Sequence, residues 1–117
     1  MELKIKRIYE KPDSNDGTRI LVDRLWPRGF TKEKAHIDIW LKDIAPTTEL
    51  RKWFGHDPAR WKEFMEKYFL ELQENTIQSE IIIEQLKYNT VTLLYGAKDE
   101  THNEAVVILE FFSQRPK

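Results

Sequence analysis

Two short apolar runs are the features that most constrain the fold of this chain. Residues 20–22 read Ile-Leu-Val, and residues 91–95 read Val-Thr-Leu-Leu-Tyr. Runs of this kind are typical of strands buried on both faces, as in the middle of a parallel sheet. The long segment between them carries helical spacing, which suits a crossover between neighbouring parallel strands. The runs therefore predict strands over residues 19–26 and 91–97 of an α/β domain.

A further strand is predicted near a sheet edge, over residues 3–9, where Leu3 and Ile5 alternate with lysines. The connection to the next strand is rich in turn residues and closes on Asp16 and Gly17. It is only about nine residues long, whereas a parallel crossover usually takes about a dozen or more. The first two strands are therefore either antiparallel or joined by an abbreviated crossover.

Helical spacing dominates the middle of the chain. A helix is predicted between Thr31 and Pro46, because the apolar positions 37, 40, 41 and 44 share one helix face. A short helix is predicted to begin at Thr47 or Thr48 and to close at Gly55. The clearest amphipathic helix follows over residues 61–72, after an Asp-Pro start signal. Residues 75–79 are expected to interrupt it, and residues 80–86 to be helical again.

The last helix is predicted from a capping box, T-x-x-E, formed by Thr101 and Glu104. Residues 105–112 are apolar on almost every side, so this helix is expected to be buried between layers. Most aromatic side chains, Trp40 included, lie on such apolar faces and are expected in the core. The whole chain, residues 1–117, is expected to be one α/β domain with about three mostly parallel strands and four or five helices.

Charge and composition narrow the function classes. The chain has 19 Lys and Arg against 20 Asp and Glu, so it lacks the basic excess of most nucleic-acid-binding proteins. It has no cysteine, which excludes disulfides, thiolate metal sites and thiol nucleophiles. No segment resembles a targeting signal or a membrane span. We therefore expect a cytoplasmic protein with no membrane contact, existing as a monomer or a homodimer.

Three motifs resemble the domain-of-unknown-function 488 family, in its YeaO-like branch. They are DGTRILVDRLWPRG at residues 16–29, KWFGHDPARW at residues 52–61 and LLYGAKDETHNEA at residues 93–105. The resemblance spans nearly the whole chain and implies a small bacterial α/β protein of unestablished activity with a parallel sheet. The wider family carries C-H-R in its last motif, and His102 followed by Asn103 stands there in this chain.

Polar side chains follow the two buried strands at the point where each strand ends. The carboxyl ends of parallel strands meet at one sheet edge, where open α/β sheets bind ligands. His and Asp side chains there suit acid/base work, and Arg and Lys suit an anionic group. The acid/base candidates are His102, His56, Asp23 and Asp99. The ligand-binding candidates are Arg24, Arg28, Lys98, Asn103, Trp26 and Trp53.

Each candidate also has a structural explanation. Asp23 and Arg24 can close a strand end as an ion pair, and Trp26 and Trp53 can brace irregular loops. Two function classes therefore stay open, and the sequence does not decide whether the protein is an enzyme. The first is a site for a small, anionic molecule, with hydrolase-type acid/base chemistry. The second is a non-catalytic module for a nucleotide, single-stranded nucleic acid or a protein partner. No cofactor and no metal site are expected, because Asp99-x-x-His102 is too short a fragment to indicate one.

Overall fold

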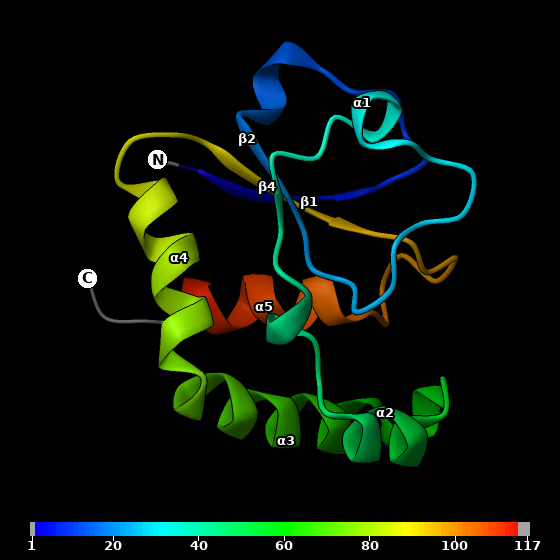
Figure 1. The fold of residues 1–117 in the computed structure, drawn as a ribbon. Coiled ribbons are helices and arrows are strands. Elements are labelled where there is room, and N and C mark those ends of the chain that lie inside the picture. Colours follow the sequence, from blue (N-terminus) through cyan, green and yellow to red (C-terminus); the bar gives the residue numbers. More distant parts are fainter. Residues whose placement is uncertain (1, 115–117) are drawn as a thin grey trace.

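The computed structural model describes residues 2–114, which fold around a parallel sheet (Figure 1). The strands lie in the order β1 (Leu3–Arg7), β4 (Val91–Tyr95), β2 (Thr18–Leu21) and β3 (Ile39–Trp40), and every neighbouring pair is parallel. The α/β class is confirmed. The described residues form four strands where the sequence predicts about three.

The two apolar runs occupy the centre of the sheet, as expected. Ile20 of β2 pairs with Leu93 of β4, and both side chains are fully buried. β4 lies between β1 and β2, so those two strands are parallel to each other without being neighbours. The antiparallel alternative is therefore wrong, and the short connection holds only a 3₁₀ turn, η1 (Ser14–Asp16).

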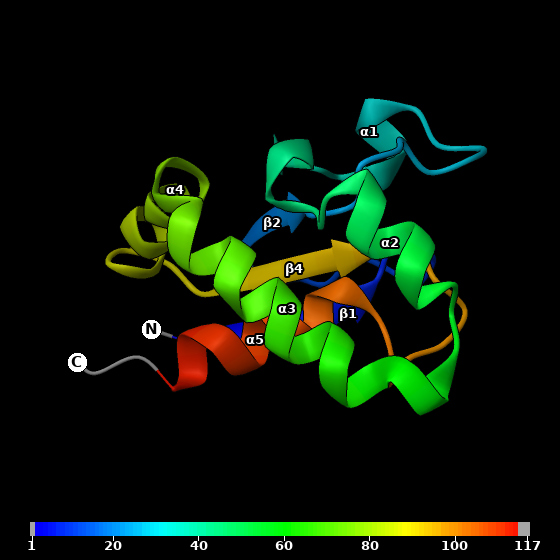
Figure 2. The same ribbon diagram turned by 90° about the horizontal axis from the view of Figure 1, so that it is seen from below.

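Five α-helices surround the sheet in residues 2–114 (Figures 1 and 2). They are α1 (Lys32–Ala35), α2 (Thr48–Phe54), α3 (Trp61–Glu74), α4 (Thr76–Leu86) and α5 (Glu104–Ser113). α5 lies between the sheet and α3, and its Ala105, Val107 and Ile108 are fully buried. α1 and its flanking loops cover the opposite face through Ala35 and Ile37. None of these helices is long and apolar enough to cross a bilayer.

The helix predicted between Thr31 and Pro46 is wrong beyond its first turn. Thr31 caps α1 by accepting a hydrogen bond from the backbone of Lys34, as expected, but α1 ends after four residues. The chain then runs extended as β3, where Leu41 N donates to Leu21 O at 2.8 Å. A 3₁₀ turn, η2 (Lys42–Ile44), follows. Positions 37, 41 and 44 are buried, as a helix face would be, but they reach the core from irregular backbone.

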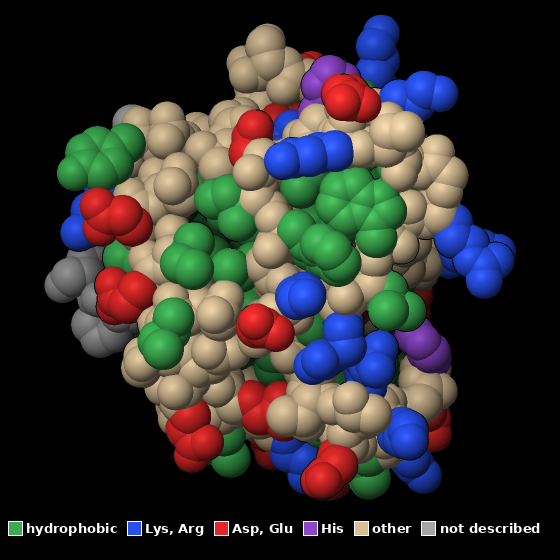
Figure 3. Space-filling view, viewed as in Figure 1, with side chains coloured by type: hydrophobic (Ala, Val, Ile, Leu, Met, Phe, Trp, Pro, Cys, Tyr) green, Lys and Arg blue, Asp and Glu red, His purple; other side chains and the backbone are tan. Residues whose placement is uncertain are grey.

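Trp40 lies on β3 and is 38% exposed, so its assignment to the core is wrong. Its indole packs edge-on against Trp26 with ring centroids 5.3 Å apart, and Lys42 Nζ lies 5.4 Å from its ring. Figure 3, viewed as in Figure 1, shows hydrophobic side chains gathered in the middle of the visible face of the molecule, with Lys and Arg side chains beside them. The aromatics of α3 and α5 meet the expectation better, because Phe64 and Tyr68 are buried and the others pack partly buried against the core.

The predicted helix signals between residues 47 and 61 are confirmed. Thr47 caps α2, Gly55 ends it with a left-handed backbone, and Asp57 caps the 3₁₀ turn η3 (Pro58–Arg60) that leads into α3. The interruption predicted over residues 75–79 is confirmed only at Asn75, because α3 ends at Glu74 and α4 begins at Thr76; the helix predicted over residues 80–86 is confirmed as part of α4.

A buried cluster of charges joins the amino end of β2 to α1. Asp16 pairs with Arg19 and with Lys6, at 3.1 Å for the lysine. The Arg19 guanidinium also donates to the carbonyls of Ala35 and His36, which end α1. Because these charges are paired with one another, the cluster fits a structural role at this edge.

Gly17 opens β2 at a place where a side chain does not fit. Its φ is 67°, and an added Cβ would lie 2.0 Å from the carbonyl oxygen of Thr90. That carbonyl accepts a hydrogen bond from Thr18 N at 2.8 Å, so the Thr90 backbone cannot move away from residue 17 without disturbing this bond.

We expect Gly17→Ala to destabilise the chain by about 4 kcal/mol or more, because backbone strain and a backbone clash combine. Gly29→Ala is the matched control, since Gly29 also has a positive φ of 81° but nothing within 4 Å of its added Cβ. Its cost should be about 1–2 kcal/mol, from the left-handed backbone alone. Urea unfolding of both variants measures the difference, and equal losses would contradict the clash.

Candidate functional site

A cavity of about 250 Å³ opens at the carboxyl ends of β2 and β4. It collects side chains from the strand ends, from the segment between η2 and α2, from the turn after α2 and from the start of α5. Its lining residues are Asp23, Arg24, Leu25, Ala45, Pro46, Arg51, Phe54, His56, Phe64, Ala97, His102, Asn103 and Glu104. Five of the ten predicted site residues line the cavity, and a sixth, Asp99, lies against His102, one of these five.

Asp23 connects several segments of the chain at this cavity. Its Oδ2 accepts a hydrogen bond from Gly96 N at 2.8 Å, which ties the end of β2 to the end of β4. Its backbone carbonyl accepts from the Trp40 indole at 2.8 Å. Its Oδ1 is buried and meets no ordinary hydrogen-bond donor within the described residues.

Glu104 is in hydrogen-bond contact with the Asp23 side chain. Burial raises the pKa of Glu104 well above its usual 4.5, and the hydrogen bond and negative charge of Asp23 raise that pKa further. Two carboxylate oxygens attract each other only when a proton lies between them. The raised pKa of Glu104 therefore favours the form in which Glu104 keeps its proton and donates it to Asp23.

Two arginines bring positive charge to the cavity that this carboxyl pair lines. Arg24 donates from Nη2 to the carbonyl of Pro46 at 3.2 Å, and its Nε is buried without a partner among residues 2–114. Arg51 extends from the last turn of α2, where its charge opposes the raised pKa of Glu104. The two guanidinium groups thus bring two positive charges to the cavity that Asp23 and Glu104 also line.

His102 is held against the cavity by Asp99. Its Nδ1 lies 3.0 Å from Asp99 Oδ2, and its ring packs edge-on against Trp61 with centroids 5.1 Å apart. A neutral imidazole whose Nδ1–H donates to a carboxylate presents Nε2 as an acceptor. Asp99 itself lies beside the cavity and does not line it.

Asp99 organises the turn before α5. It accepts from the backbone N–H groups of Thr101 and His102, each at 3.0 Å. The Thr101 backbone hydrogen bond is the main cause that lowers the pKa of Asp99 to about 2. Its stabilising effect is therefore present above the ordinary value of 3.8 and is lost as the pH falls toward 2.

The predicted capping box at Thr101 and Glu104 is wrong. Asn103 caps α5 instead, accepting from Val106 N at 3.0 Å and donating to Asp99 O at 2.9 Å. The Thr101 hydroxyl bonds to Asp99 at 3.1 Å. Because Asp99 and Asn103 satisfy these backbone groups, Glu104 is free to turn toward Asp23.

His56 reaches the cavity from a strained turn. Gly55 and His56 both have left-handed backbones, with φ of 54° and 57°. A residue with a Cβ pays about 1–2 kcal/mol for this conformation, which glycine adopts freely. The turn brings the imidazole within 6.2 Å of the Phe54 ring, measured between centroids.

Four predicted ligand-binding residues lie outside the lining of the cavity: Arg28, Lys98, Trp26 and Trp53. Trp26 braces its loop by donating to the carbonyl of Phe30 at 2.7 Å. The Trp53 ring is in contact with two cations of its own chain, with Lys67 Nζ 4.2 Å from its centroid. Arg28 and Lys98 are exposed.

Sequence reasoning missed Arg51 and Glu104. Arg51 had a weak signal, as a cation one turn before the Gly-His-Asp loop. The signal of Glu104 was its acidic side chain in the first turn of a buried helix, which the capping-box pattern accounted for equally well.

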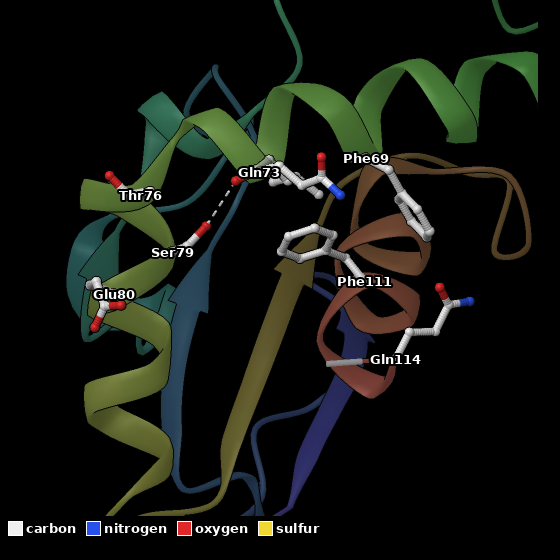
Figure 4. A pocket seen from close by; sticks show the side chains of 8 residues that line it. Phe69, Gln73, Thr76, Ser79, Glu80, Phe111 and Gln114 are labelled. Carbon is white, nitrogen blue, oxygen red and sulfur yellow. Dashed lines mark hydrogen bonds between the residues drawn. The ribbon is translucent and has the colours of Figure 1, made fainter. Parts of the chain in front are cut away.

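A second cavity of about 370 Å³ lies between α3, α4 and the end of α5 (Figure 4). Phe69 and Phe111 form part of its wall, and Ser79 donates to the carbonyl of Leu72 at 3.4 Å. Glu80 is its one charged lining residue among those described. It lacks the converging cations and imidazoles of the strand-end cavity, which is therefore the better candidate site.

Glu104→Gln tests the shared proton. Because the pKa of Glu104 is raised by folding, its contribution to stability is complete below about pH 4.5 and is lost as the pH rises through the folded-state pKa. Glutamine donates to Asp23 without titrating. We expect the melting temperature of the unmodified chain to fall relative to that of Glu104→Gln between pH 5 and pH 8.

Glu110→Gln, an exposed position on the same helix, is the control and should show a pH-independent difference. Asp23, Arg24, Arg51, His56, His102 and Tyr68 surround Glu104 and are present in both chains, so their own titrations largely cancel. A flat difference for Glu104→Gln would show that Glu104 is ionised in the folded chain.

Comparison with known proteins agrees with the motif resemblance. The chain is 40% identical over 111 residues to the uncharacterised protein YeaO of Escherichia coli, covering 95% of this chain and 96% of that protein. It is 43% identical over 79 residues to the uncharacterised proteins Mb3100c of Mycobacterium bovis and Rv3073c of Mycobacterium tuberculosis, covering 68% of this chain and 67% of each relative. No solved structure matches it. A family model described as the inactive DUF488-N3 subclade matches residues 2–117, and the chain therefore belongs to this DUF488-N3i family.

Proposed function

We propose that the strand-end cavity binds a small organic anion and that the chain binds this molecule without converting it. The observation that carries the proposal is the convergence of Arg24 and Arg51 on one cavity at the carboxyl edge of β2 and β4. Open α/β sheets bind their ligands at this edge. Guanidinium groups recognise carboxylate and phosphate through paired hydrogen bonds.

The charges of the cavity support an anionic ligand. Arg24 and Arg51 carry two positive charges, and the raised pKa of Glu104 lowers the negative charge of the Asp23–Glu104 pair that lines the cavity with them. Within residues 2–114 the Arg24 side chain donates a hydrogen bond only from Nη2, and a guanidinium has five N–H donors. An incoming anion would satisfy donors that the described residues leave without a partner.

The composition of the cavity supports binding without conversion. Its lining includes no serine, threonine or cysteine, so it lacks the usual hydroxyl and thiol nucleophiles. His102 stands where the wider family carries a cysteine. The matching family model is described as an inactive subclade, which fits a chain that retains a binding cavity after losing its reactive group.

Acid/base chemistry of the hydrolase type is the second candidate function. The specific observation in its favour is that Asp23 and Glu104 line one cavity, with the pKa of Glu104 raised by burial and by its contact with Asp23. Two carboxyl groups with different proton affinities can act as acid and base. A slow conversion of the bound anion would establish this candidate over binding alone.

Binding of single-stranded nucleic acid has less support. Unpaired bases bind by stacking on accessible aromatic rings. Loop aromatics such as Trp26 and Trp53 suggested this function. The Trp53 ring already contacts Lys67 and Arg60, and Trp26 packs against Trp40.

Arg51→Gln tests the proposed anion site. We expect small carboxylates and phosphate esters, added at constant ionic strength, to shift the backbone amide resonances of Gly96 and Asn103 in a saturable manner. Arg51→Gln should weaken that binding by about tenfold, because it removes a charge-assisted hydrogen bond. Arg28→Gln is the matched control, since it removes the same charge from an exposed residue outside the cavity.

The control should change the dissociation constant less than about twofold, as a screened surface charge does. Equal weakening by both variants would mean that only the net charge of the chain matters. Absence of saturable shifts with every anion would overturn the proposal.

A further inference from the structure

The cavity is lined by both polar and apolar side chains. Arg24, Arg51 and the Asp23–Glu104 pair lie among its polar lining. Its apolar lining is formed by Leu25, Ala45, Pro46, Phe54, Phe64 and Ala97. A ligand that matches both kinds of lining has one charged end and an apolar body.

The aromatic part of the wall suits a flat body. Phe54 and Phe64 are stacked with ring centroids 4.3 Å apart and planes inclined by 18°. The cavity volume of about 250 Å³ equals that of about eight water molecules in the liquid, which limits the ligand to a small molecule.

Leu25 gives an independent reason to expect an apolar ligand. It follows the end of β2, lines the cavity and is 71% exposed. Burying exposed apolar surface is favourable by about 25 cal/mol per Å². An apolar body lying in the cavity would cover this side chain.

The carboxyl pair discriminates between anions. Asp23 and Glu104 line the cavity together with the two arginines, and the raised pKa of Glu104 favours a single negative charge on this carboxyl pair. A carboxylate places one negative charge among these groups and leaves them balanced. A phosphate or phosphonate dianion adds a second negative charge, which the Asp23 carboxylate repels at short range.

On the basis of the proposed function, we infer that the ligand of this cavity is a small monocarboxylic acid with a flat or branched apolar body, bound as its anion. Its carboxylate lies against Arg24 and Arg51, and its body lies between Leu25 and the Phe54–Phe64 stack. Asp23 and Glu104 set the preference for a single negative charge.

Three probes with the same phenyl ring separate the parts of this inference: benzoate, phenylphosphonate and benzamide. Isothermal titration calorimetry at pH 8 and constant ionic strength gives their dissociation constants with the full chain. We expect benzoate to bind at least about tenfold more tightly than the dianionic phenylphosphonate, and more tightly than the neutral benzamide. Asp23→Asn should narrow the gap between benzoate and phenylphosphonate.

Leu25→Ala tests the apolar contact. It should weaken benzoate binding by about threefold to tenfold, because part of the apolar contact is lost. Ile77→Ala is the control, since Ile77 is 75% exposed on α4 and lies outside the cavity. Both positions are exposed, so neither variant should unfold the chain.

The outcomes separate the two proposals. If phenylphosphonate binds as tightly as benzoate or more tightly, the site takes anions but the monocarboxylate class is wrong. If benzamide equals benzoate, the ring alone is recognised, and both the anion site and the monocarboxylate class are wrong. If Leu25→Ala and Ile77→Ala have the same effect, the apolar contact is wrong. If none of the probes binds and the wider set of anions gives no saturable shifts, the proposed function fails as well.

Discussion

The contact between Asp23 and Glu104 is the interaction on which the candidate site depends. Asp23 joins the end of β2 to the end of β4 through Gly96 N, and it meets α5 through Glu104. Three elements far apart in the sequence are therefore held at one corner. The cavity, its two arginines and the turn that carries His102 are arranged around this corner.

Connecting secondary-structure elements through a buried pair of carboxyl groups costs free energy. Burial disfavours the ionised form, and removing one partner of a buried pair usually costs more than the pair contributes. The Lys6–Asp16–Arg19 cluster at the amino edge does a similar structural job with opposite charges. Carboxyl groups with strongly shifted pKa values are more frequent at binding and catalytic sites than at purely structural positions. The Asp23–Glu104 pair therefore supports the proposed binding site.

The sequence predicted the sheet well where burial alone decided the outcome. The runs at Ile20 and Leu93 could only be central strands, and the long crossover made them parallel. The sequence prediction was wrong where one residue spacing fits two different structures. Leu41 and Ile44 fall at helical intervals, yet Leu41 pairs with β2 through its backbone, a long-range contact that local spacing does not encode. Likewise Glu104 fitted a capping box, and only the competing bonds of Asn103 redirected it. The convergence of Asp23, Arg24, His56 and His102 followed from strand-end geometry, whereas the turns that exclude Arg28 and Lys98 did not.

The central claim is that Glu104 and Asp23 share one proton in the folded chain. Carbon-13 NMR of chain labelled at the side-chain carboxyl carbons follows each group through a pH titration. The account predicts that Glu104 changes protonation far above the ordinary value of 4.5 and that Asp23→Asn lowers this midpoint. A Glu104 resonance that titrates near 4.5 and ignores Asp23→Asn would contradict the account.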